Sequence, residues 1–173
     1  MPDTQWPRFE VFLIEDERKP AEHVGSVHAP DPEMALLNAR DVFVRRPHCE
    51  GLWVAASGHV LFRTAEELAR DPVSQNGHPG EERRYLVFGK PNHREPLALA
   101  ACLSAQSPEE ALAQALKESS AIESVLWAVV SEAELTRSDR NDRVSFFEPA
   151  ATKNYKLHAE YPTARLMKEI RQK

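Results

Sequence analysis

An internal similarity between two halves of the chain constrains its fold more than any other feature of the sequence. Residues 8–12 (RFEVF) and 84–88 (RYLVF) align after a shift of 76 positions, and the same shift places Pro32 on Pro108. Each proline stands at the start of an apolar pattern with helical spacing, where proline commonly begins a helix. We therefore interpret the chain as two copies of one unit, the second of them divergent.

The predicted unit has the order strand, strand, helix, strand. In the first copy, residues 8–14 alternate and are rich in aromatic and branched side chains, and residues 24–28 form a second extended run. Residues 32–45 carry apolar side chains at spacings of three and four, as an amphipathic helix does. Residues 51–56 are a short apolar run between turn signals, which indicates a third strand.

Both predicted helices have explicit start signals. Asp31 precedes Pro32, the order expected of an N-cap residue and a proline at the first helical position. The second helix begins with Ser107 and Pro108 and has Glu110 three residues after the serine, which is the pattern of a capping box. These signals predict helices that start at equivalent positions in the two copies.

Two tryptophans mark the strand that follows each helix. Beyond the helices the best shift between the copies becomes 74 positions, and it aligns Trp53 with Trp127. Aromatic rings at equivalent places of a repeat favour core packing over a ligand-binding role. We therefore expect both rings to be equivalent core residues.

The expected fold class is α+β, with two tandem β-β-α-β (ferredoxin-like) repeats that form an intrachain pseudo-dimer with antiparallel sheets. One helix covers one face of each small sheet, and pairing two units covers the rest. The expected divisions are a first repeat at 1–70, a linker rich in Pro, Gly and Asn at 71–82, a second repeat at 83–144 and an aromatic tail at 145–173.

Composition excludes several classes of function. The formal net charge is -5, so a nucleic-acid partner, which needs a basic face, is not expected. The sequence begins without a basic and apolar leader and has no apolar run of membrane-spanning length, so we expect a cytoplasmic protein without a membrane partner. Its two cysteines, Cys49 and Cys102, do not suggest a disulfide framework.

No motif for catalysis, cofactors or metals is found. His48 and Cys49 are adjacent in a loop, where neighbours seldom reach one ion, and His23 and His28 point to opposite faces of their strand. No glycine-rich phosphate loop or nucleophile motif is present. We therefore predict no catalytic, cofactor-binding or metal-binding residues.

Several segments nevertheless point to a known family. The chain closely resembles the PaaB family, the B subunits of bacterial phenylacetyl-CoA epoxidases. The resemblance is carried by residues 23–29 (HVGSVHA), residues 34–41, the pair Arg45 and Arg46, residues 52–54 (LWV) and the tail segment 146–155 (FFEPAATKNY).

The resemblance implies a non-catalytic, structural or bridging subunit of a multicomponent di-iron phenylacetyl-CoA oxygenase in aerobic phenylacetate degradation. It implies that the di-iron centre belongs to the catalytic A subunit, with C as its structural partner and a reductase as a further candidate partner. No cofactor is expected in the B subunit itself. The residues expected to bind partners are Arg45, Arg46, Phe146, Phe147, Lys153, Tyr155 and Tyr161. The tail aromatics could equally complete the local core.

A second class of function remains open. Paired ferredoxin-like units can enclose a cavity, so the chain could be a small-molecule-binding protein or a cofactor-free enzyme in which His28, His59 or Arg40 lines a pocket. A large closed apolar pocket with converging polar groups would favour that reading. An exposed apolar patch would favour the subunit reading.

Overall fold

The computed structural model describes residues 6–44, 49–73, 81–118, 124–141 and 143–151, together with Met167 and Ile170. Its strands are β1 (Arg8–Ile14), β2 (Glu22–His28), β3 (Gly51–Ala56), β4 (Val60–Thr64), β5 (Arg83–Lys90), β6 (Leu97–Ala105), β7 (Leu126–Ser131) and β8 (Thr136–Arg137). Its helices are α1 (Pro32–Phe43), α2 (Ala65–Arg70), α3 (Pro108–Glu118) and α4 (Arg143–Ala151), with short 3-10 helices η1 (Ser57–His59) and η2 (Glu132–Glu134). The predicted α+β class is confirmed.

The predicted helix starts are present. The Asp31 side chain accepts a hydrogen bond of 2.7 Å from the Met34 amide, so Asp31 is the N-cap of α1. At α3, Ser107 Oγ accepts from the Glu110 amide at 3.1 Å. The Glu110 carboxylate accepts from the Gln106 amide, one residue before the cap, so the reciprocal bond is displaced from that of a standard capping box.

All eight strands belong to one antiparallel sheet in the order β4-β7-β5-β6-β2-β1-β3-β8. Strands β4 and β8 are absent from the predicted unit. Each crosses to the other half of the sheet, because β4 pairs with β7 while β8 pairs with β3. We call β1–β4 with α1 and α2 the first half, and β5–β8 with α3 and α4 the second half.

The strand order is symmetric about its centre. It reads the same from either end if β1, β2, β3 and β4 are exchanged with β5, β6, β7 and β8 respectively. The strands β2 and β6 meet at the centre, through Glu22 with Ala98 and His23 with Leu97. The pairing of β1 with β2 and that of β5 with β6 both shift register, after Val11 and after Val87 respectively. The irregularity therefore recurs 76 residues later, at the shift that relates residues 8–12 to 84–88.

The predicted equivalence of the two tryptophans is wrong. Phe12 faces Trp53 across β1 and β3, while its counterpart Phe88 faces Ala128, and Trp127 instead faces Gly89. The register thus relates β3 to β7 by 75 residues rather than 74. Matching identical side chains misplaced the strand by one residue, which puts the two rings on opposite faces of the sheet.

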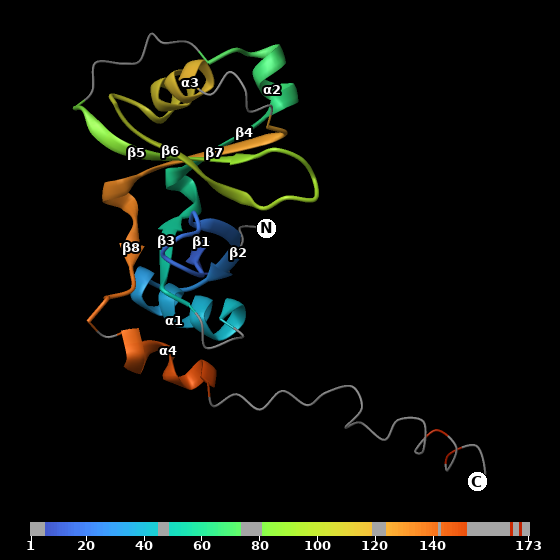
Figure 1. The fold of residues 1–173 in the computed structure, drawn as a ribbon, viewed down its shortest axis with the longest axis vertical. Helices are drawn as coiled ribbons and strands as arrows, with labels where there is room; N and C mark the ends of the chain where they lie inside the picture. The colour runs from blue at the N-terminus through green and yellow to red at the C-terminus, as the bar shows by residue number, and fades with distance from the viewer. Residues whose placement is uncertain are drawn as a thin grey trace.

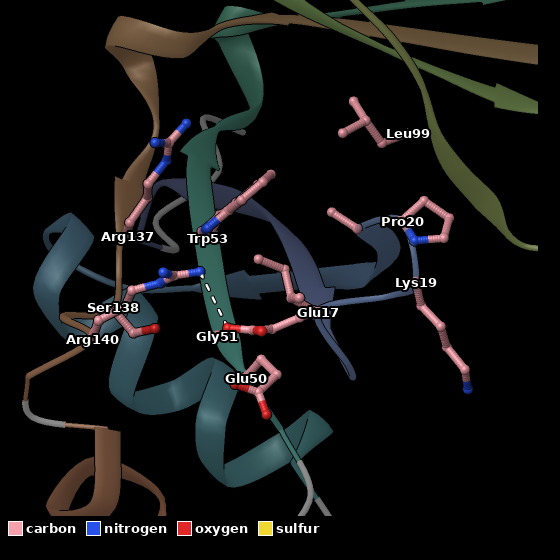
Figure 2. A pocket seen from close by; sticks show the side chains of 12 residues that line it. Glu17, Lys19, Pro20, Glu50, Gly51, Trp53, Leu99, Arg137, Ser138 and Arg140 are labelled. Carbon is pink, nitrogen blue, oxygen red and sulfur yellow. Dashed lines mark ion pairs between the residues drawn. The ribbon is translucent and has the colours of Figure 1, made fainter.

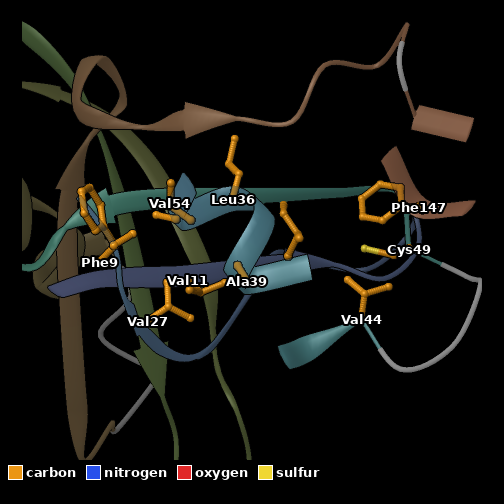
Figure 3. Close-up of a cluster of buried hydrophobic side chains, with 12 residues drawn as sticks. Phe9, Val11, Val27, Leu36, Ala39, Val44, Cys49, Val54 and Phe147 are labelled. Carbon is orange, nitrogen blue, oxygen red and sulfur yellow. The ribbon is translucent and has the colours of Figure 1, made fainter. Parts of the chain in front are cut away.

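Helices cover the outer faces of the two halves, and the inner faces pack on each other (Figure 1). An outer cluster of buried side chains lies between α1 and β1–β3, and another lies between α3 and β5–β7 (Figure 3 shows the first). A central cluster combines residues of both halves, including Phe12, Phe88 and Ala128, and the rings of Phe12 and Phe88 stack with centroids 4.5 Å apart. The two halves therefore share one core.

Candidate partner-binding surface

The two predicted partner-binding residues that the structure describes lie on α4. Phe147 is 6% exposed and belongs to the outer cluster under α1, with its ring visible at the end of that cluster in Figure 3. The Phe146 ring packs edge-on against Phe147 at 4.9 Å, and the Arg40 guanidinium lies 5.3 Å from the Phe146 centroid. These two aromatics pack α4 against the first half. This packing corresponds to the alternative in which the tail aromatics complete the local core.

The other five predicted partner-binding residues lie outside the described residues. They are Arg45, Arg46, Lys153, Tyr155 and Tyr161. Their role in binding remains a prediction.

Exposed large apolar side chains gather around α1. Met34, Leu37 and Val42 on this helix are 40%, 37% and 50% exposed, and Trp6, which precedes β1, is 60% exposed. Val144 on α4 is also exposed. Within the described residues from 49 to 141, by contrast, no large hydrophobic side chain is exposed. Sequence periodicity alone could have indicated Met34 and Leu37, because they lie opposite the buried positions Ala35, Leu36 and Ala39.

A buried carboxylate, missed from the sequence, organises a polar cluster on β1. Glu10 is 3% exposed, and its carboxylate accepts hydrogen bonds from His23 Nε2 at 2.8 Å and Ser57 Oγ at 2.5 Å. The Arg8 guanidinium lies 3.0 Å from the same carboxylate and donates to Ser57 Oγ at 2.9 Å. Burial alone would raise the pKa of Glu10, but the bonds from His23 and Ser57 and the charges of His23 and Arg8 leave this pKa below its ordinary value.

The second half has no equivalent of this buried carboxylate. The register places Leu86 where the first half has Glu10, and Leu99 where it has His23. The contact of an arginine on the first strand of each half with the following 3-10 helix is retained. Arg84 lies 3.4 Å from Glu132 of η2, as Arg8 donates to Ser57 of η1. The arrangement Glu10–His23–Ser57 lacks a nucleophile bonded to a base, since histidine and serine both donate to the carboxylate.

A pocket of about 490 Å³ opens where the β1–β2 turn, β3, β6 and β8 meet (Figure 2). Leu99 and Trp53 are among its apolar lining residues, and the Arg137 guanidinium lies 4.8 Å from the Trp53 ring centroid. The charged side chains at its mouth are paired, with Arg137 2.7 Å from Glu132 and Arg140 3.7 Å from Glu17. The pocket is partly open and lined by both charged and apolar groups.

The three residues considered for a pocket-based function do not line this pocket. His28 Nδ1 donates to the Trp6 carbonyl at 2.7 Å, and His59 forms an ion pair with Glu134, which links η1 to η2. Arg40 donates to the Phe146 carbonyl at 3.3 Å. All three make contacts that join separate parts of the fold.

Groups suited to metal or thiol chemistry are few in the described part of the chain. No cluster of three or more His, Cys, Asp or Glu residues there is placed to hold a metal ion. Cys49 is buried, and burial raises the pKa of its thiol to about 11, whereas Cys102 is exposed. None of the described helices combines the length and hydropathy needed to cross a membrane.

Comparison with known proteins identifies the family. A family model described as phenylacetic acid degradation B (PaaB) matches residues 5–76, which contain the strands β1–β4. The B subunit of the 1,2-phenylacetyl-CoA epoxidase of Escherichia coli (strain K12) is 39% identical over 67 residues, which make up 39% of this chain and 70% of that protein. No solved structure gives a significant match. The chain therefore belongs to the PaaB family of phenylacetic acid degradation proteins.

Proposed function

We propose that this chain is a non-catalytic subunit that organises a multicomponent phenylacetyl-CoA epoxidase by binding its A and C subunits. The family membership supplies the reaction context, since the curated relative is named as an epoxidase subunit. The observation that carries the proposal is the grouping of exposed apolar side chains on and beside α1, within the family-matched residues. Apolar side chains exposed together on one face are a common sign of a protein-binding surface.

The test is co-expression of the affinity-tagged chain with the A and C subunits of the same genome, followed by size exclusion with mass measurement. The proposal predicts co-elution of the chain with at least one of these subunits. An unrelated tagged protein of similar size controls for capture by the tag. Elution of the chain alone, at its own mass of 19.6 kDa or at a multiple of it, would contradict the proposal.

We further propose that the two halves are repeats of one unit and that the single chain takes the place of a pair of B subunits. The palindromic strand order, the recurring register shift and the exchange of β4 and β8 support this reading. Sedimentation of the isolated chain tests it, with a monomer as the expected result. A homodimer formed through the sheets, with the two halves of each chain unpaired, would refute the pseudo-dimer.

Small-molecule binding is the second candidate, and the pocket beside Trp53 is the observation that favours it. Its support is weaker, because ligand pockets are usually closed and mainly apolar. In this pocket the arginines Arg137 and Arg140 already have carboxylate partners. Saturable binding of a small molecule that W53A abolishes would raise this candidate above the first.

A further inference from the structure

We infer that, of its two long helices, the chain uses only α1 to bind its partner subunit: α1 has an exposed apolar face for which α3 in the second half has no working equivalent. We call Met34 and Leu37 of α1, together with the adjacent Trp6, the α1 face. The inference rests on the proposed subunit function and adds which surface is used and what the partner must present.

The two long helices can be compared residue by residue. Each begins with proline after a capping side chain, Asp31 in α1 and Ser107 in α3. The residues that face the sheet follow at the same offset of 76, with Ala35, Leu36 and Ala39 buried on α1 and Ala111, Leu112 and Ala115 buried on α3. The outward positions therefore correspond as well.

At the outward positions the two helices differ in chemistry. Met34 of α1 corresponds to Glu110 of α3, whose carboxylate accepts from the Gln106 amide at 2.8 Å and is therefore part of the helix start. Leu37, 37% exposed, corresponds to Ala113, which is 7% exposed. The helix α3 thus presents neither apolar side chain of the α1 face.

Helix α2 and the segment after it also cover this part of α3. Leu68 and Val73 pack against the outer cluster under α3, and together with Ala113 they line a shallow groove of about 240 Å³. On α1, the corresponding cover comes from α4, whose Phe146 packs at Arg40 and leaves Leu37 exposed. A partner that binds the exposed face of α1 would be blocked at the corresponding place on α3 by Leu68 and Val73.

Charge separates the two faces further. The exposed Glu33 lies beside Met34 and Leu37 on α1, as does Asp41, which also pairs with Arg40 at 3.1 Å. On α3, Lys117 stands at the place of Asp41. Complementary charge selects partners and orients them during association. The partner is therefore a subunit surface with an apolar centre and basic side chains at its rim.

Trp6 belongs to the same face. Its carbonyl accepts from His28 Nδ1 at 2.7 Å, and the His28 carbonyl in turn accepts from Asn38 Nδ2 at 3.1 Å. These bonds fix the segment before β1 to the middle of α1. A large aromatic side chain, 60% exposed and held next to a helix with exposed apolar residues, is the type of residue that dominates binding energy at interfaces.

One face per chain limits how the chain can connect subunits. It cannot cross-link two copies of one partner through equivalent helices, as a symmetric pair of units would.

The test compares binding of the purified A and C subunits to three forms of the full chain by calorimetry. The variant M34Q/L37Q replaces the two helical side chains of the α1 face, Met34 and Leu37, with glutamine, which has good helix propensity. The control K117D changes charge on the equivalent face of α3. Circular dichroism and thermal unfolding establish that each variant is folded, and M34A/L37A provides a second truncation if glutamine impairs folding.

We expect M34Q/L37Q to raise the Kd about tenfold or more, and K117D to change it by less than about threefold. If folded M34Q/L37Q or M34A/L37A binds as tightly as wild type, or if K117D weakens binding equally, the one-face inference is overturned while the subunit function stands. If the wild-type chain binds neither A nor C, the proposed function itself fails. One bound partner copy per chain through this face supports the inference, and two copies of the same partner oppose it.

Discussion

Replacing Glu10 with leucine should destabilise the fold strongly, whereas replacing Glu10 and His23 together should cost much less. Glu10 is buried and is the acceptor for the His23 ring and the Ser57 hydroxyl. E10L leaves both part-buried donors without this acceptor. The double variant E10L/H23L recreates the pair of leucines that the second half has at the same register.

The magnitude follows from the number of donors left unpaired. Each buried polar group without a partner costs about 1–3 kcal/mol, so E10L should lower the free energy of unfolding by about 3 kcal/mol. Ser57 retains its bond from Arg8, and both donors are only part-buried, which keeps the expected loss in the lower half of the range of about 2–6 kcal/mol for two groups. Replacing both polar partners by apolar groups is often close to neutral, so E10L/H23L should cost about 1 kcal/mol or less.

Urea unfolding of wild type, E10L, H23L and E10L/H23L provides the assay, as a double-mutant cycle. The expected coupling energy is about 2 kcal/mol in favour of the double variant. Strictly additive effects, or a double variant less stable than E10L, would refute the view that the cluster is an internally satisfied polar group that the apolar pair can replace.

Three further predictions concern single groups. The pKa of Glu10 is lowered, so ionised Glu10 stabilises the fold fully above its ordinary pKa of 4.5, and this stabilisation is lost as the pH falls through the lowered pKa. On acidification, the free energy of unfolding should therefore fall more steeply for wild type than for E10Q. A thiol reagent at neutral pH should modify Cys102 rapidly and Cys49 only after denaturation, and two fast thiols would contradict the burial of Cys49. Gly25 has φ of +139°, and the Phe43 ring lies 2.9 Å from where a Cβ would stand, so G25A should lower the free energy of unfolding by more than about 1 kcal/mol. The control G58A adds a Cβ in open space and should change this free energy by less than about 0.5 kcal/mol. Equal effects of the two variants in thermal unfolding would contradict this prediction.

Local signals in the sequence predict much of the fold. The cap residue Asp31, the proline after it and the alternation in residues 8–14 each act within a few residues of the element that they define. The capping bond joins residues three apart in the sequence, and the alternation indicates which side chains face the two sides of a strand, so both can be predicted from a short stretch of sequence. These elements were therefore accessible without knowledge of tertiary contacts.

Long-range pairing was not accessible in the same way. The strands β4 and β8 are short, and each is stabilised by a strand of the other half, so their own residues carry little signal. The polar cluster joins Glu10 to His23 and Ser57, which are 13 and 47 residues away. The one usable hint was a glutamate between Phe9 and Val11, since a charge within an otherwise apolar strand needs buried partners.

The most direct test of partner binding through the α1 face is the mass of the complex that forms when the tagged chain is co-expressed with the A and C subunits, measured for wild type and for M34Q/L37Q. We expect wild type to co-elute with a partner subunit, with one partner copy bound per chain through the α1 face. We expect the folded variant to lose most of this association. Wild-type chain that elutes alone would contradict the proposed function. A folded variant that co-elutes as wild type does would contradict the assignment of the α1 face.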